Sequence, residues 1–156
     1  MTFISSLNYP GGYALSYVHT LGSSYPKARV YIDTYSAMNG VSRFSENNGD
    51  WTYYKTDSEL SRDEFKTFDF ILANDRTSHS DDFYTVAAIK GYSGISIPST
   101  KNLLGLLKTL PEKVAYLVSN PEDALIPNIV KSDRNDILGI IKLSPKVWIL
   151  KNKNLL

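Results

Sequence analysis

The chain has 156 residues, of which 42% are hydrophobic and 21% are charged, so the composition predicts one folded domain and argues against disorder. Its formal net charge of +1 gives no electrostatic basis for binding nucleic acid or an anionic membrane surface. Because the sequence contains no cysteine, it excludes disulfides, thiolate nucleophiles and cysteine-based zinc sites.

The first predicted elements are a helix and a strand. Pro10 fixes its φ angle and two glycines follow it, which predicts a sharp entry into a helix. Apolar residues then recur at helical spacing over residues 13–21, and a Gly-Ser-Ser-Tyr-Pro stretch at 22–26 ends the pattern. Residues 28–34 are β-branched and aromatic, which predicts a buried strand.

The middle of the chain predicts a turn, a short strand and a short helix. The turn is expected at residues 47–50, and the short strand, at the periphery of the fold, at residues 51–54. Ser61 is a suitable N-cap with Glu64 three residues later, which is the spacing of a capping box. A short helix is therefore predicted over residues 62–67.

The rest of the chain completes a mixed sheet. The predicted elements are a buried strand at 68–73, a polar loop at 74–82, a strand or extended element at 83–90, a short amphipathic helix around the leucines of 103–107, an irregular insertion at 111–136 and a final strand at 146–151. The sequence therefore predicts a single α/β domain with a mixed sheet flanked by short helices.

The glycine turn at residues 8–12 has two interpretations. Backbone N–H groups at the start of a helix bind anions, and two glycines allow a ligand to approach closely. The spacing matches neither the dinucleotide-binding pattern nor the P-loop pattern, and no lysine follows. A structural turn is therefore favoured over an anion site.

Two charged residues lie near the end of the first predicted strand. Asp33 follows the strand directly, and Arg43 lies just beyond the next loop. Such a pair could contact a ligand, since arginine suits bidentate recognition of phosphate or carboxylate. The favoured alternative is a structural ion pair that holds the loop.

No complete catalytic set or metal site is found in the sequence. The adjacent acids Asp81 and Asp82 indicate a solvated loop, and the two histidines, His19 and His79, lack metal-ligand spacing. His19 is expected to have a structural role near the end of its helix. The Gly-Tyr-Ser-Gly stretch at 91–94 lacks the spacing of a nucleophile elbow, which excludes a serine hydrolase of that type.

Two stretches contain distinctive sequence motifs. Residues 5–19 contain Asn-Tyr-Pro-Gly-Gly with a histidine downstream, and residues 31–44 contain Tyr-Ile-Asp and then Asn-Gly-Val-Ser-Arg-Phe. Both resemble the segment after the last membrane helix in the dolichyl-phosphate-mannose-dependent α-1,6-mannosyltransferases of asparagine-linked glycan assembly. The family pattern has His and Thr where this chain has Tyr31 and Asn39.

Weaker similarities to the same family follow in the same order along the chain. They lie at residues 51–55, 68–73, 91–97 and 145–151, so that the resemblance covers nearly the whole chain and residues 111–136 are the least matched. The family consists of polytopic GT-C membrane proteins whose acidic catalytic residues lie in an early lumenal loop. This chain resembles only their C-terminal lumenal domain.

The resemblance implies where this chain lies in the cell and which reaction its parent enzyme catalyses. Residues 1–7 would end a membrane helix or linker, and residues 8–156 would form a lumenal domain in the endoplasmic reticulum. The implied parent enzyme transfers mannose from dolichyl phosphate mannose to a dolichol-linked oligosaccharide, and its partners are these lipids and its own membrane domain. No catalytic residue, metal, cofactor or nucleic acid is assigned to this chain, which alone is expected to be inactive.

The expected role of the domain is to shape one wall of the acceptor cleft. The candidate residues for this site or for a structural motif beside it are Asn8, Tyr9, Pro10, Gly11, Gly12, Asp33 and Arg43. The alternative is a free-standing soluble α/β binding module with an anion site at the glycine turn. Membrane spans encoded upstream of Met1 would favour the transferase over this module.

Overall fold

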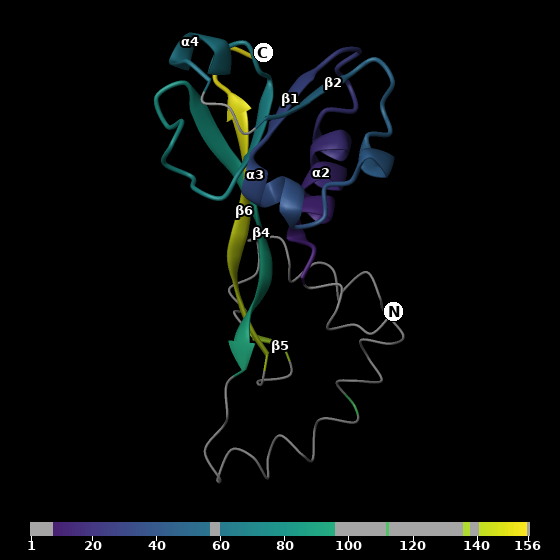
Figure 1. Ribbon diagram of the computed structural model, residues 1–156, viewed down its shortest axis with the longest axis vertical. Helices are drawn as coiled ribbons and strands as arrows, with labels where there is room; N and C mark the ends of the chain where they lie inside the picture. The colour runs from purple at the N-terminus through teal and green to yellow at the C-terminus, as the bar shows by residue number, and fades with distance from the viewer. Residues whose placement is uncertain (1–7, 57–59, 96–111, 113–135, 138–140, 156) are drawn as a thin grey trace.

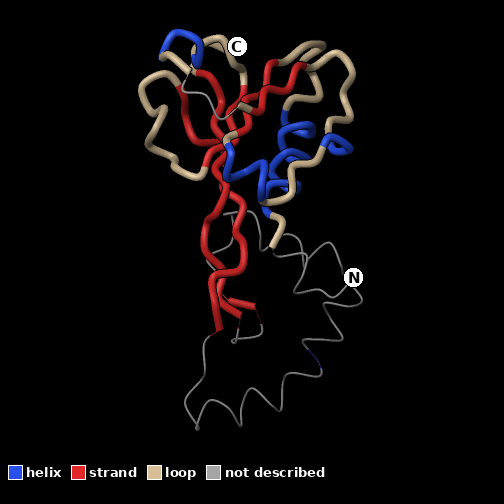
Figure 2. Tube along the Cα trace, in the orientation of Figure 1, coloured by secondary structure: helices blue, strands red, loops and turns tan. Residues whose placement is uncertain are grey.

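A computed structural model describes residues 8–56, 60–95, 112, 136–137 and 141–155 of the chain, which contain a mixed sheet and short helices (Figures 1 and 2). The helices are α2 (Pro10–Leu21), α3 (Thr34–Met38), the 3-10 helix η1 (Arg43–Ser45) and α4 (Arg62–Phe65). The strands are β1 (Arg29–Ile32), β2 (Thr52–Lys55), β3 (Phe70–Ala73), β4 (Phe83–Ile95), β5 (Asp136–Ile137) and β6 (Ile141–Asn152).

The sheet has the order β2-β1-β3-β6-β4, with β5 beside one end of β6. Strands β1, β2 and β3 are parallel, and β6 runs antiparallel to β3, β4 and β5. The predicted α/β domain with a mixed sheet is therefore confirmed. Strand β2 lies at one edge, as expected for the short peripheral strand.

Helix α2 covers one face of the sheet. Its residues Ala14, Leu15 and Val18 are fully buried, and they pack with the side chains of β1, β3, β4 and β6 that point to the same face. Alternate strand residues share one face of a sheet, which is why Val30 and Ile32 belong to this cluster while Tyr31 does not. The apolar spacing over residues 13–21 therefore predicted both the helix and its buried side.

Helix α4 covers the opposite face. Its Phe65 packs against a second buried cluster that contains Tyr31, Ile71 and Phe83. The predicted capping box is formed, because the Ser61 side chain accepts from the Glu64 amide and the Glu64 carboxylate accepts from the Ser61 amide. Strand β3 is buried along its whole length because both clusters lie against it.

Strands β4 and β6 extend beyond the body of the sheet as a long two-stranded ribbon (Figures 1 and 2). Both strands are longer than predicted, since β4 continues through residues 91–94 and β6 begins before Pro145. A register shift between Ile89 and Lys90 lies opposite this proline. Proline lacks the N–H that a ladder needs, and bulges are where sheets tolerate it.

Several predictions fall outside the described residues. These are the domain boundary at residue 7, the helix around 103–107 and nearly all of the insertion at 111–136. No helix among the described residues is long and apolar enough to cross a membrane.

Candidate functional site

The two distinctive stretches of the sequence meet at the start of helix α2. The Gly11 amide donates to the Asn39 carbonyl oxygen at 2.8 Å. A Cβ atom added to Gly11 would overlap the Ser36 carbonyl oxygen and would lie 2.9 Å from that of Asn39. We call this contact between residues 9–12 and residues 36–40 the junction. It brings two backbones together at a distance that only glycine permits.

Gly40 completes the junction from the other side. Its φ of +107° is a conformation that L side chains rarely adopt, and an added Cβ would lie 2.8 Å from the Tyr9 Cβ. A Cβ on Gly12 would in turn lie 3.0 Å from the Gly40 carbonyl oxygen. Packing thus explains the glycines of both stretches, and an anion cradle gains little support because the Gly11 amide already has a partner.

The other residues of the glycine turn lie at the edge of the junction. Pro10 is buried in the first turn of α2, whose N-cap residue Tyr9 makes no side-chain capping bond. Asn8 is exposed, and Tyr9 is 49% exposed. The turn therefore presents polar and aromatic groups to solvent while its proline and first glycine are used for packing.

Asp33 supports the backbone at the carboxyl ends of β1 and β3. One carboxylate oxygen accepts from the Ser36 amide at 2.6 Å and caps α3, and the other accepts from the Asn74 amide at 2.7 Å. Helix α3 was not predicted, because Asp33 was interpreted as the end of a strand. The expected ion pair with Arg43 is not formed among the described residues.

Replacing Asp33 by alanine should therefore destabilise the fold. The variant loses a helix cap and a link between two strand ends, which should lower the free energy of unfolding by about 2–3 kcal/mol. Urea unfolding of Asp33→Ala measures this loss, with Asp50→Ala, at an exposed loop position, as the matched control. A loss no larger than that of the control would mean that the Asp33 carboxylate is dispensable for folding and free for a ligand.

Arg43 lies on η1, which follows the junction directly. Its side chain is exposed and forms no ion pair among the described residues. The turn itself is held by a 3.1 Å hydrogen bond between the Ser42 and Ser45 hydroxyls. Phe44 is 94% exposed beside it. The structure therefore presents a guanidinium and a phenyl ring that the fold does not use.

Two further side chains of the junction are exposed. Met38 at the end of α3 is 80% exposed, and Tyr9 borders the same junction. We call Tyr9, Met38, Arg43 and Phe44 the junction surface. The sequence analysis selected Tyr9 and Arg43 but not Met38 or Phe44, because helices as short as α3 and η1 show no periodicity that would mark an apolar residue as exposed.

His19 has the structural role that the sequence predicted. Its Nε2 atom lies 2.8 Å from the Tyr53 hydroxyl oxygen, and its ring packs edge-on against Trp51. Burial lowers the pKa of His19 below 6.5, and burial likewise lowers the pKa of His79. Both imidazoles are therefore more easily protonated in the unfolded chain than in the fold.

This difference predicts how stability depends on pH. Below about pH 6.5 the unfolded chain binds protons that the folded chain does not, so the free energy of unfolding falls as the pH drops toward 5. Its slope is at most about 1.4 kcal/mol per pH unit for each histidine. Urea unfolding at several pH values checks this, and His19→Gln should flatten the slope. A stability that rises on acidification over this interval would contradict the expectation.

The described residues contain no group of three or more His, Asp or Glu side chains that could hold a metal ion. The residues selected from the sequence are the glycine turn at 8–12, the capping aspartate Asp33, and Arg43, which forms no ion pair among the described residues. These residue types suit the binding of a ligand, through a guanidinium and exposed aromatic groups.

Comparisons with known proteins identify relatives that carry the name of the same enzyme. No protein-family model matches the chain, and no solved structure matches it. A Drosophila melanogaster protein, "Dol-P-Man:Man(7)GlcNAc(2)-PP-Dol alpha-1,6-mannosyltransferase", is 27% identical over 92% of this chain and 24% of its own length. The Arabidopsis thaliana protein of the same name is 41% identical over 50% of this chain and 16% of its own length.

The third relative is a probable enzyme of the same name from Schizosaccharomyces pombe. It is 30% identical over 95% of this chain and 29% of its own length. The chain thus spans less than a third of the length of each relative it matches. The chain is therefore a homologue, over nearly its entire length, of one part of the Dol-P-Man-dependent α-1,6-mannosyltransferases.

Proposed function

We propose that this chain is part of an enzyme that transfers mannose from dolichyl phosphate mannose to a dolichol-linked oligosaccharide, forming an α-1,6 linkage. The observation that carries the proposal is that three relatives with this one activity in their names match the chain, two of them over at least 92% of its length. The chain would lie on the lumenal side of the endoplasmic reticulum membrane, joined to the membrane domain of the same enzyme.

Within that enzyme, the junction surface would form one wall of the acceptor site. Arg43 supports this role because its guanidinium is exposed and forms no ion pair with any residue that the structure describes, and arginine binds phosphate oxygens in a bidentate manner. The relatives' names give an acceptor that joins a mannose-containing glycan to PP-Dol. Phe44 and Met38 would pack against apolar parts of such a molecule, because their burial there removes hydrophobic surface from water.

A chimera tests the proposed activity. The part of the Schizosaccharomyces pombe relative that aligns with this chain is replaced by this chain, and transfer of mannose from dolichyl phosphate mannose to the Man(7) acceptor is measured in membranes. We expect α-1,6 transfer by the chimera and none by the isolated 156-residue chain. A chimera that accumulates to normal levels but transfers no mannose would contradict the proposal.

A further inference from the structure

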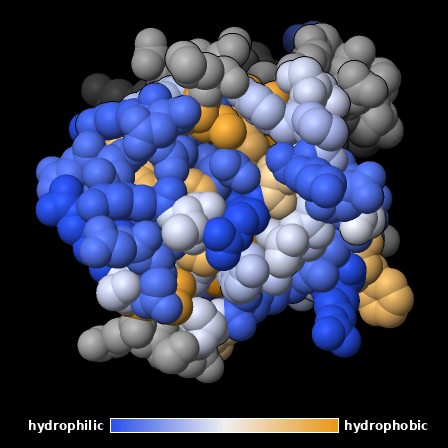
Figure 3. Space-filling view, turned by 90° about the horizontal axis from the view of Figure 1, so that it is seen from above, coloured by the Kyte–Doolittle hydropathy of each residue, from blue (hydrophilic) through white to orange (hydrophobic). Residues whose placement is uncertain are grey.

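A cavity of about 340 Å³ lies on the face of the sheet opposite helix α2. Its walls are formed by α4 and by residues 77–83 of the loop that leads into β4. This volume is at the lower end of the range for small-molecule sites, and it suits one sugar ring or a molecule of similar size. Seen from the end that carries α4, the surface is largely hydrophilic with small apolar patches (Figure 3).

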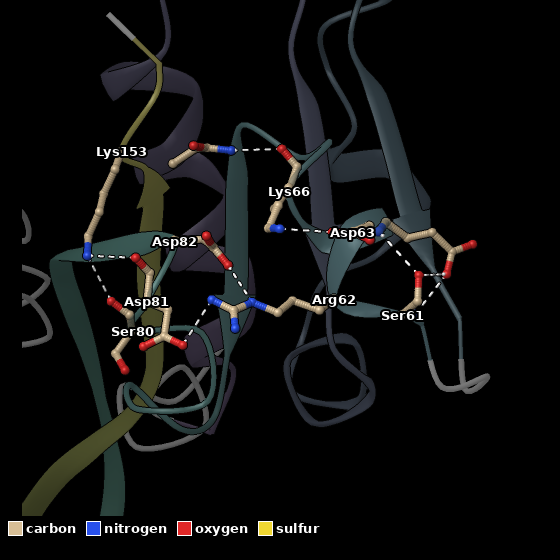
Figure 4. A network of polar contacts seen from close by, with 10 residues as sticks. Ser61, Arg62, Asp63, Lys66, Ser80, Asp81, Asp82 and Lys153 are labelled. Carbon is tan, nitrogen blue, oxygen red and sulfur yellow. Dashed lines mark hydrogen bonds and ion pairs between the residues drawn. The ribbon is translucent and has the colours of Figure 1, made fainter.

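One wall of the cavity carries the charged side chains of Arg62, Asp81 and Asp82. The Arg62 guanidinium binds Asp82 through Nε at 3.1 Å and Asp81 through Nη2 at 3.0 Å (Figure 4). Lys153 donates to the backbone carbonyls of Ser80 and Asp81 at 2.9 Å each, which ties the loop to the end of the chain. The carboxylates keep lone pairs free, since each accepts a bond from Arg62 at only one oxygen.

The other wall is aromatic. The rings of Phe65 and His79 lie 4.3 Å apart between their centroids, and Phe83 packs against His79. The His79 ring makes no hydrogen bond within the part of the chain that the structure describes. Burial keeps the pKa of this histidine below its usual value, so the neutral ring offers one donor and one acceptor.

These groups suit a neutral ligand rich in hydroxyls. Among the residues that line the cavity, one guanidinium, Arg62, pairs with both carboxylates, Asp81 and Asp82, so the lining has a net charge of −1, which disfavours an anion, and neither carboxylate is left unpaired for a cation. Sugar hydroxyls donate to carboxylates and accept from guanidinium N–H groups, and the C–H face of a pyranose ring packs on aromatic rings. We propose that this cavity binds a hexopyranose residue of a neutral saccharide.

The inference goes beyond the proposed function and does not depend on it, because the cavity lies on the other face of the sheet from α2 and its occupant can be tested on this chain alone. Amide signals of the 156-residue chain are followed by NMR while methyl α-D-mannopyranoside or methyl α-D-glucopyranoside is added. We expect shifts confined to residues 77–83 and α4, with a Kd of about 1 mM for at least one glycoside.

Two variants of the chain sharpen the test. Asp81→Ala should weaken glycoside binding about fivefold or more, because it removes an acceptor from the cavity wall. Asp63→Ala is the matched control, since this acid lies on α4 next to Arg62 but pairs with Lys66 and does not line the cavity. Melting curves of both variants establish that they are folded.

Three results would overturn the inference. One is the absence of shifts at glycoside concentrations tenfold above the expected Kd. Another is equal binding by Asp81→Ala and the unchanged chain. The third is a response of the same amides to inorganic phosphate but not to either glycoside, which would make the cavity an anion site.

Discussion

Gly11→Ala should destabilise the fold by about 3 kcal/mol or more, although the substitution places a better helix former within a helix. Helix propensity alone would predict a gain of about 0.5–1 kcal/mol from replacing glycine by alanine. The steric effect is larger, because the new methyl group would overlap the Ser36 carbonyl oxygen. The obstacle is backbone, and Ser36 itself is fully buried, so neither side can move at small cost.

Two related substitutions make the Gly11 measurement decisive. Gly12→Ala should cost about 1–2 kcal/mol, since its Cβ would meet only the Gly40 carbonyl oxygen at 3.0 Å. Gly49→Ala should change stability by less than about 0.5 kcal/mol, because nothing lies within 4 Å of its Cβ. Urea unfolding of the three variants gives this order. Equal losses of unfolding free energy in Gly11→Ala and Gly49→Ala would contradict the close backbone contact described at the junction.

The local elements were predicted because their signals are local. The capping box between Ser61 and Glu64 involves residues three apart, and the apolar side of α2 follows the period of a single helix. Strand β3 was predicted from the mostly apolar stretch at residues 68–73, and the structure buries it on both faces. In each case the residues that determine the element lie within it.

Helix α3 was missed because its signal is short and has two interpretations. Five residues cannot display a helical period, and Asp33 serves as well at the end of a strand as at the start of a helix. Strands β4 and β6 of the ribbon were predicted too short for a different reason. Pro145 and the glycines of 91–94 usually end strands, whereas here register shifts accommodate them.

The candidate site was only partly predictable. The sequence selected the glycine turn and Arg43, and it favoured a structural role for the turn. It could not show that Gly11 and Asn39 share a hydrogen bond, because that contact joins residues of two elements across a tertiary interface. The cavity beside α4 was missed as well, since Arg62 and Asp82 are distant in sequence and each alone is typical of a solvated surface.

The junction surface should govern acceptor binding, and replacing both Arg43 and Phe44 by alanine should raise the acceptor KM about tenfold. The loss corresponds to one charge-assisted contact and one apolar contact, which together exceed about 1.4 kcal/mol. Thermal stability should stay unchanged, because both side chains are exposed and Phe44 is 94% exposed. Arg76→Ala is the matched control, since it removes the same charge from an exposed position beyond β3.

The acceptor KM of these variants in the Schizosaccharomyces pombe chimera is the most direct test of the proposed acceptor site. The proposal predicts a KM about tenfold higher for the double variant, with the donor KM and the Arg76→Ala control unchanged. An unchanged acceptor KM in a double variant that accumulates and melts normally would contradict it.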